Sequence, residues 1–364
     1  LMEQVVREHI RSDVPYGLFL SGGVDSGILA AMLQRYQKQP LRTFTMGFKG
    51  VRMQDEVEPA QRIATQFNTH HSVVELDQEA LWHRLPHTVW ACDELMRDYA
   101  CLPTGSLAEA AGKELKVVFS GEGGDEAFAG YRRYKVPLVE RWAKALIKPG
   151  SGGFRTGNQW RSSWSRQLFG PELNAAQAKP DTAFGEIWRS APSQWGHLRR
   201  CQYTDLVSAL PDDLLVKADR MLMAFGVEGR VPFLDHRVVE FGLALPDRLK
   251  VRDAEGKWFL KRWAERMLPR DHLARAKTGF HVPVGEWLRG ERLTGVLVGL
   301  QRNEAISRWF KPEGLTWLVE RQQRRGDASR ALWSLMQLAI WHRLFIAGLE
   351  GVPATQEDPI DWMH

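Results

Sequence analysis

The stretch LFLSGGVDSGILAAML, residues 18–33, decides the fold of this chain. Its first residues form a short apolar run typical of a buried strand, and the residues from Val24 onward follow the pattern of a helix with an apolar face. The turn between them contains two glycines, which allow a ligand to approach the backbone closely. The free N–H groups and the dipole at the start of a helix favour an anion there. The stretch therefore predicts an anion site between a strand and a helix.

One carboxylate, Asp25, lies inside this expected anion site. It would repel a phosphate unless a Mg²⁺ ion lay between them, and Mg²⁺ is bound in proteins through one or two carboxylates together with substrate phosphates. Ser21 and Ser26 add hydroxyl donors on either side. The local chemistry therefore favours a Mg²⁺–polyphosphate site. The alternative is an ordinary glycine turn with an aspartate in the first turn of a helix, where Asp is favoured.

A second stretch, KVVFSGEGGDEAFAGY at residues 116–131, has the same design. A β-branched strand ends at Ser120-Gly121, and the acids Glu122 and Asp125 follow among further glycines. If the two strands are neighbours, Asp25 and Asp125 face each other across one cleft, and two carboxylates around a phosphate-bound Mg²⁺ are a natural arrangement. The alternative is an acidic turn that caps a helix.

The first 135 residues alternate expected strands with helices, which is typical of a parallel sheet covered on both faces. Ligands of such sheets bind beyond the carboxyl ends of the strands, where the glycine-rich and acidic turns fall. We therefore predict an α/β fold with a parallel twisted sheet, helices on both of its faces and a mainly helical C-terminal part. The expected divisions are an α/β core at 1–135, a variable Gly- and Trp-rich segment at 136–200, and a helical part at 201–364 that completes the active site. The expected strands are 16–20, 42–48, 71–76 and 116–120, and none is expected after residue 201.

Composition excludes several classes of protein. The 364 residues carry a net charge of only +5, and the most basic run, RQQRRGDASR at 321–330, is more typical of a solvated helix end than of a nucleic-acid site. No apolar run approaches the roughly 20 residues of a membrane span. Three cysteines without a CxxC pair indicate reduced thiols, and hence a cytoplasmic protein without a zinc site. The chain begins at Leu1 rather than Met, so we expect it to be part of a longer protein.

Two further stretches mix charge with apolar residues in an unusual way. KADRMLMAFGVEGRVPFLDHRVVEF, residues 217–241, contains charged residues that could form a buried ion network or simply lie on the surface: Lys217, Asp219, Arg220, Glu228 and Arg230. RAKTGFHVP, residues 275–283, places Lys277 before a Thr-Gly turn. This lysine is a surface charge unless its loop folds back over bound phosphates.

Together these four stretches resemble the synthetase domain of the glutamine-dependent asparagine synthetase family. SGGVDS resembles the pyrophosphatase loop (PP-loop) shared by N-type ATP pyrophosphatases, and SGEGGDE, EGRVPFLDHR and RAKTGFHVP in this order are similar to the asparagine-synthetase branch. The resemblance covers residues 1–291 and is weakest at 140–200. It implies an adenine nucleotide alpha-hydrolase-like fold. It also implies an AMP-forming carbon–nitrogen ligase that adenylates a carboxylate with ATP, releases pyrophosphate and transfers ammonia or an amine to give an amide.

The resemblance also implies roles for individual residues. Asp25 and Asp125 would hold Mg²⁺. Lys277 would be a catalytic cation for pyrophosphate departure, and Glu122 a catalytic carboxylate that accepts a proton from the nitrogen nucleophile. The residues expected to bind ATP are Phe19, Ser21, Gly22, Gly23, Asp25, Ser26, Met46, Ser120 and Gly121.

The chain departs from the family in two places. Relatives usually carry an N-terminal glutaminase domain whose first residue is a nucleophilic cysteine, and this sequence begins with leucine instead. We therefore expect either that such a domain has been removed and would supply the ammonia, or that the chain uses free ammonia or another amine. Ala100 and the Leu95-Met96 pair replace residues usual in relatives, which leaves the acceptor open among aspartate, a peptide or amino-acid derivative, and a sugar uronate.

Two other functions remain as alternatives. A PP-loop enzyme of tRNA modification would use the same ATP loop, but thiolating members need paired cysteines, and the diffuse basic charge predicts no nucleic-acid partner. A non-catalytic nucleotide-binding module would not need Asp25, Asp125, Glu122 and Lys277 together. We expect no membrane partner, and the sequence leaves a homodimer open.

Overall fold

The computed structural model describes residues 1–48, 56–96, 98–147, 152, 154, 162–176, 181–275, 282, 284–348 and 351–364. The chain forms two compact units that are each built from separate stretches of sequence. The first contains Leu1–Leu76, Ser106–Thr156 and Pro180–Gly279, and the second contains Asp77–Gly105, Gly157–Lys179 and Phe280–His364. None of the helices in the described part of the chain has the length and apolar character needed to span a membrane.

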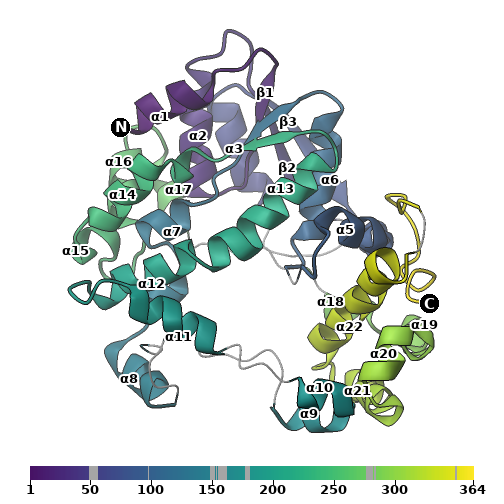
Figure 1. The fold of residues 1–364 in the computed structure, drawn as a ribbon. Coiled ribbons are helices and arrows are strands. Elements are labelled where there is room, and N and C mark those ends of the chain that lie inside the picture. The colour runs from purple at the N-terminus through teal and green to yellow at the C-terminus, as the bar shows by residue number, and fades with distance from the viewer. Residues whose placement is uncertain are drawn as a thin grey trace. The chain divides into compact units, whose positions relative to one another are not determined.

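A five-stranded sheet forms the centre of the first unit (Figure 1). Its order is β3-β2-β1-β4-β5, and every neighbouring pair is parallel. The predicted α/β class with a parallel sheet is confirmed. The strands are β1 Tyr16–Phe19, β2 Arg42–Phe48, β3 His70–Leu76, β4 Val117–Phe119 and β5 Glu228–Arg230.

Successive residues of a strand point to opposite sides of the sheet. Because both sides carry apolar side chains here, helices cover both faces of the sheet. Leu18, Val117 and Phe119 belong to one apolar cluster, whereas Phe44 and Val118 belong to another. The first cluster is completed by α1 Met2–His9, α2 Val24–Gln34, α3 Val57–Gln66, α7 Gly124–Phe128, α14 His236–Ala244, α16 Trp258–Ala264 and α17 Arg270–Ala274, and the second by α6 Cys101–Gly112 and α13 Val216–Met223.

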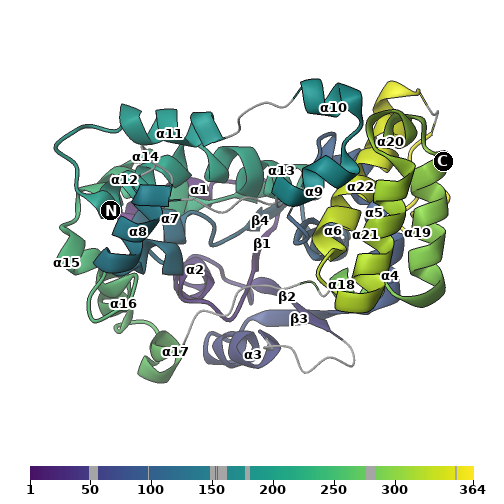
Figure 2. The same ribbon diagram turned by 90° about the horizontal axis from the view of Figure 1, so that it is seen from below.

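The remaining elements are helical. The first unit also contains η1 Arg132–Lys135, α8 Leu138–Ile147, α11 Asp181–Ser190, α12 His197–Leu206, η2 Leu210–Leu215, η3 Pro232–Leu234 and α15 Asp247–Lys250. The second unit contains α4 Gln78–His83, α5 Leu85–Cys92, α9 Ser162–Leu168, α10 Pro171–Ala175, α18 Val284–Trp287, α19 Gly290–Arg302, α20 Glu304–Trp309, α21 Pro312–Arg325, α22 Ser329–Trp341 and η4 His342–Ile346 (Figure 2).

Trp333 organises the interior of the second unit. Its ring packs edge-on against Trp82 and Tyr99, with ring centres 6.4 and 5.8 Å away, and lies 5.9 Å from the ring of Trp287. Such aromatic pairs stabilise a core beyond the area that they bury. They join α22 to α4, to α18 and to the segment before α6.

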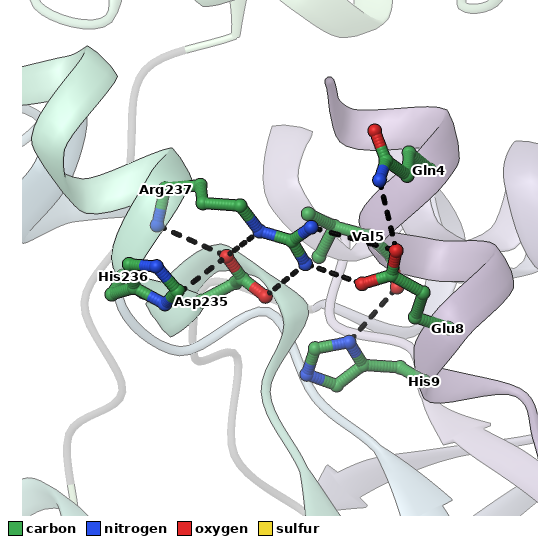
Figure 3. A network of polar contacts seen from close by, with 7 residues as sticks. All are labelled: Gln4, Val5, Glu8, His9, Asp235, His236 and Arg237. Atoms are coloured by element: carbon green, nitrogen blue, oxygen red, sulfur yellow. Dashed lines mark hydrogen bonds and ion pairs between the residues drawn. The ribbon is translucent and has the colours of Figure 1, made fainter.

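Arg237 fastens α14 to α1 (Figure 3). Its guanidinium donates to both oxygens of Asp235, over 2.9 and 2.8 Å, and also to Glu8 at the end of α1. Asp235 in turn caps α14 by accepting from the backbone N–H of Arg237, at 3.0 Å. The hydrogen bonds from Arg237 lower the pKa of Asp235 to about 2.

Three of the five charged residues of the 217–241 stretch are exposed, so the five do not form one buried ion network, although Lys217 is buried. Asp219, Arg220 and Glu228 are exposed, which leaves their charges in water. Arg230 pairs with Glu228 over 2.7 Å and donates to the backbone carbonyl of Arg11 over 2.8 Å. This arginine therefore attaches β5 to the chain just after α1.

Candidate active site

The turn between β1 and α2 is tied together by its serines. The buried hydroxyl of Ser26 donates to the carbonyl of Ser21 over 2.8 Å, and the two hydroxyls lie 3.1 Å apart. α2 begins at Val24, so its first N–H groups belong to this turn. Ser26 therefore shapes the turn from inside, while Ser21 and Gly23 are exposed at its surface.

The turn between β4 and α7 lies directly beside the first one. β4 pairs with β1 in parallel, with Leu18 opposite Phe119, so both turns leave the same edge of the sheet. A Cβ atom on Gly121 would lie 3.0 Å from the Cβ of Asp25 and 3.0 Å from the backbone nitrogen of Ser26. The structure thus brings together Ser21, Ser26, Gly121, Asp25 and the β4–α7 turn.

A lysine joins two carboxylates in the helices that follow these turns, Asp25 of α2 and Asp125 of α7. The ammonium of Lys257 contacts Oδ2 of Asp25 and lies 2.8 Å from Oδ1 of Asp125. The three side chains are 8%, 13% and 14% exposed for Lys257, Asp25 and Asp125, so the cluster is largely shielded from water. Asp25 and Asp125 therefore do face one position, and that position holds a cation.

Two glycines make room for this cluster. A Cβ on Gly124 would lie 2.5 Å from Oδ1 of Asp25, and one on Gly130 would collide with Oδ1 of Asp125 and with the side chain of Lys257. A side chain at either position would displace a carboxylate. Gly124 and Gly130 therefore allow the charged groups to approach closely.

Electrostatics keep Lys257 charged. Burial acts to lower its pKa, but the charges of Asp125 and Asp25 outweigh this effect and raise the pKa above its ordinary value. The backbone of Lys257 is in the left-handed region, with φ 55°, where it caps α16, and its N–H donates to the carbonyl of Phe128. The position of the lysine is thus fixed by a backbone hydrogen bond and by the contacts of its side chain with the two aspartates.

The cluster fits a bound Mg²⁺ ion, because Asp25 and Asp125 already surround a cation, the ammonium of Lys257. Mg²⁺ prefers one or two carboxylates and completes its shell with water and phosphate oxygens. Among the residues that the structure describes, no group of three or more His, Cys, Asp and Glu side chains could hold a metal alone. A metal here therefore requires a ligand that brings further oxygens.

α7, which carries Asp125 in its first turn, is supported by a buried polar network. Gln202 donates to the carbonyls of Glu126 and Ala127 over 2.7 and 2.8 Å, and Lys250 donates to Gln202 over 2.8 Å. Glu126 also accepts from the hydroxyl of Tyr131 at 2.5 Å. Burial raises the pKa of Glu126 and lowers that of Lys250 to about 8. The network fixes the backbone that presents Asp125.

The other predicted site residues lie at the same edge or outside the described residues. Phe19 ends β1, Met46 is in β2, and Ser120 follows β4, where its N–H donates to the carbonyl of Arg230 over 3.0 Å. Glu122 is half-buried in the β4–α7 turn. Lys277 belongs to the segment 276–281, which lies outside the described residues.

Sequence reasoning missed Lys257. The residue is one of 49 lysines and arginines, and in GKWFLKRWA only the preceding glycine distinguishes it from the lysine four positions later. A Gly-Lys pair directly before an apolar helix is the only local signal. Its contact with two distant carboxylates becomes visible only in the folded chain.

Comparison with known proteins now identifies the family. The family model described as asparagine synthase matches residues 1–343. The chain belongs to the asparagine synthase family. The predicted resemblance is confirmed, and the match extends past residue 291 to α22 and η4.

Individual members of the family are similar over most of this chain. Asparagine synthetase (glutamine-hydrolysing) 1 of Bacillus subtilis is 29% identical over 367 residues, which cover 94% of this chain and 58% of that protein. A Mycobacterium bovis protein, provisionally named a glutamine-hydrolysing asparagine synthetase, is 32% identical over 373 residues, 95% of this chain and 57% of that protein. Amidase chyE of Penicillium rubens is 27% identical over 312 residues, 68% of this chain and 45% of that protein. The chain thus spans little more than half the length of the first two relatives.

Proposed function

We propose that this chain is the synthetase part of an ATP-dependent, AMP-forming amide ligase. The observation that carries the proposal is the position shared by Asp25 and Asp125, where two strand-end turns of a parallel sheet surround one cation. Membership of the asparagine synthase family supports the same reaction class. A module that only bound nucleotide would not need two shielded carboxylates beside its phosphate loop.

ATP would bind with its phosphates over the β1–α2 turn, where the N–H groups at the start of α2 meet the exposed Ser21 and Gly23. Mg²⁺ held by Asp25 and Asp125 would supply positive charge to the phosphates. The ammonium of Lys257 would then leave the position between the carboxylates and turn toward the phosphate oxygens. Phe19, Met46, Ser120 and Gly121 would contact the adenosine.

The chemistry proceeds in two displacements. A carboxylate oxygen of the acceptor attacks the α-phosphorus of ATP, the bond to the bridging oxygen breaks, and pyrophosphate leaves with that electron pair. Lys277 would stabilise the departing pyrophosphate. Nitrogen then attacks the carbonyl carbon of the acyl-adenylate, AMP departs, and Glu122 accepts the proton that the nitrogen loses. The products are an amide, AMP and pyrophosphate.

The names of the relatives suggest which acceptors and which nitrogen source to test. Two relatives carry the name of glutamine-hydrolysing asparagine synthetases, which makes aspartate the first acceptor to test. Another is named an amidase, so the carboxylates to be tested also include peptide and amino-acid derivatives and sugar uronates. All three cysteines of this chain are buried, so none offers an accessible thiol for glutamine hydrolysis, and we expect the chain to use ammonia.

Exchange of labelled pyrophosphate into ATP tests the proposal. The chain should catalyse exchange only when Mg²⁺ and a suitable carboxylate are present, because reversal of adenylation needs both. Adding ammonia should then give AMP and the amide in equal amounts. Exchange in the absence of any carboxylate, or formation of ADP and phosphate, would contradict the reaction class.

A further inference from the structure

Helix α7, Gly124–Phe128, is only five residues long, and Asp125 lies in its first turn. A helix of this length is not stable on its own, because its few hydrogen bonds do not offset the order that they require. Its position must therefore come from the parts of the chain that contact it. Since little more than one helical turn separates its two ends, the groups that hold its last carbonyls also set the place of Asp125.

The four carbonyls at the end of α7 have no acceptor role inside a longer helix and need donors from elsewhere. Those of Asp125 and Phe128 accept from backbone N–H groups. Those of Glu126 and Ala127 accept from the side-chain amide of Gln202, over 2.7 and 2.8 Å. Gln202 belongs to α12, which lies beside α7 (Figure 1). One amide from another helix therefore caps the end of α7.

Lys250 fixes the orientation of this cap. Its ammonium donates to Oε1 of Gln202 over 2.8 Å and to the carbonyl of Leu243 over 3.0 Å. An ammonium can only donate and a carbonyl can only accept, so the amide must turn its oxygen toward Lys250 and its nitrogen toward α7. A charged donor at the oxygen also strengthens the hydrogen bonds that the nitrogen donates. Lys250 and Gln202 thus act in series on α7.

The charge of Lys250 opposes folding. Gln202 is 0% exposed and Lys250 1% exposed. Burial lowers the pKa of Lys250 to about 8, Asp247 of the same helix acts to raise it, and Arg199 of α12 acts with burial. The folded chain therefore disfavours the ammonium at neutral pH. What the ammonium contributes in return is the hydrogen bond that orients Gln202.

We propose that Gln202 and Lys250 are positioning residues of the metal site. Lys250 orients Gln202, and Gln202 holds the helix that presents Asp125. The inference rests on the proposed function, because the exact place of Asp125 matters to the reaction only if this carboxylate holds Mg²⁺. Without the cap, α7 shifts and the carboxylates of Asp25 and Asp125 no longer share one position. Mg²⁺ and ATP should then bind more weakly, while the reaction at saturating Mg²⁺ changes less.

Binding of nucleotide and metal tests the proposal without any turnover. The full chain is titrated in a calorimeter with the Mg²⁺ complex of an ATP analogue that has a methylene group between its α- and β-phosphorus atoms. Gln202→Met keeps the length of the side chain but removes both donors, and it should weaken binding about tenfold or more. Gln202→Glu keeps the shape and the contact with Lys250, but its carboxylate cannot donate to α7, so it should be equally weak.

Pyrophosphate exchange separates a positioning role from a general loss of structure. In Gln202→Met the Mg²⁺ concentration that gives half the maximal rate should rise about tenfold, whereas the maximal rate should change by less than about threefold. Lys250→Met should raise that concentration only about threefold, because the amide of Gln202 is still present. The double variant should be no weaker than Gln202→Met, since Lys250 acts only through Gln202.

Gln322→Met is the matched control. Gln322 is also buried, and its amide donates to the carbonyls of Gly285 and Leu288 over 3.3 and 3.4 Å in the second unit. Its replacement should lower stability in urea as much as Gln202→Met does, but it should leave the affinity for the Mg²⁺ complex unchanged. Equal losses of affinity in the two variants would overturn the proposal.

Two further results would contradict this role for Gln202 and Lys250. Unchanged affinity in Gln202→Met would overturn it, as would losses in the two single variants that add up in the double variant. If circular dichroism shows that Gln202→Met does not fold, Lys250→Met decides by the same criterion of unchanged affinity. An unaltered chain that neither binds the Mg²⁺ complex nor exchanges pyrophosphate would instead contradict the proposed function, and this inference would fall with it.

Discussion

The ammonium of Lys257 lies 2.8 Å from Asp125 and also contacts Asp25, so one cation bridges two carboxylates from the first turns of α2 and α7. The cluster has a formal charge of −1 from these three side chains. Without Lys257 the same space would hold two like charges shielded from water, which is costly. The lysine therefore stabilises the site in the absence of a metal, and a bound metal ion would balance the charge of the two carboxylates in its place.

Lys257→Met should destabilise the chain by about 3 kcal/mol, because it leaves two buried carboxylates without their cation. Urea denaturation in the presence of a chelator measures this loss. Mg²⁺ should restore part of the stability of the variant and have less effect on the unaltered chain, in which Lys257 occupies the position. Lys261→Met is the control, since Lys261 pairs with Glu255, a partly exposed glutamate that precedes α16. Equal stability of Lys257→Met and the unaltered chain would show that the carboxylates do not need this cation.

Asp25→Asn and Asp125→Asn should each reduce pyrophosphate exchange by about 10²–10³-fold, because each removes a charge expected to hold Mg²⁺ while the other carboxylate keeps its contact with Lys257. Circular dichroism should show an intact fold, since both side chains lie in the first turn of a helix and outside the apolar core. Glu255→Gln, beside Lys257 in the chain but paired with Lys261, is the control. Near-normal exchange in either aspartate variant would remove that residue from the proposed metal site.

The α/β fold could be predicted because its signals are local. The strands at residues 16–20, 42–48, 71–76 and 116–120 are apolar or β-branched runs that end in turn residues, and the structure places β1 to β4 there within one or two residues. β5 was missed because its sequence, Glu-Gly-Arg, has no strand character. Only pairing with β4 makes it a strand. A three-residue edge strand of this kind is a product of tertiary structure.

The site could be predicted in part for the same reason. Asp25 and Asp125 follow strands directly, so the topology of a parallel sheet brings them together once the strands are neighbours. Lys257 enters from the start of α16, and its position depends on the packing of α16 against α7. The exposure of apolar side chains of α8, such as Trp142 and Leu146, could not be predicted either, because an amphipathic pattern does not say which face of a helix meets the protein.

Gly124→Ala should abolish most pyrophosphate exchange in a folded protein. Its new methyl group would lie 2.5 Å from Oδ1 of Asp25, so the carboxylate must leave the position that it shares with Asp125. Gly185→Ala is the matched control, because nothing lies within 4 Å of the added atom and the residue is in α11. Replacing a helical glycine there should stabilise the chain by about 0.5–1 kcal/mol. Full activity in Gly124→Ala would indicate that the precise position of Asp25 is unimportant.

Asp235 gives a prediction for the pH dependence of stability. Hydrogen bonds from Arg237 lower the pKa of Asp235 from 3.8 to about 2, so its charged form stabilises the folded chain at every pH above 3.8. This contribution is lost as the pH falls through about 2. Asp235→Asn removes the charge but keeps a side chain that can cap α14, whereas Asp235→Ala removes both and should cost about 1 kcal/mol more.

Thermal unfolding of these two variants and of the unaltered chain, followed as the pH is lowered, separates the contributions of charge and cap. The stability difference between the unaltered chain and Asp235→Asn should be largest near neutral pH and should shrink as the pH falls from 3.8 toward 2, because in this range Asp235 of the unfolded chain binds a proton while the native carboxylate still does not. The difference between Asp235→Asn and Asp235→Ala should persist, since a cap does not titrate. Asp253→Asn, at a side chain 94% exposed, should follow the unaltered chain at every pH. A constant gap between Asp235→Asn and the unaltered chain would mean that the contact between Asp235 and Arg237 contributes no charge-dependent stability.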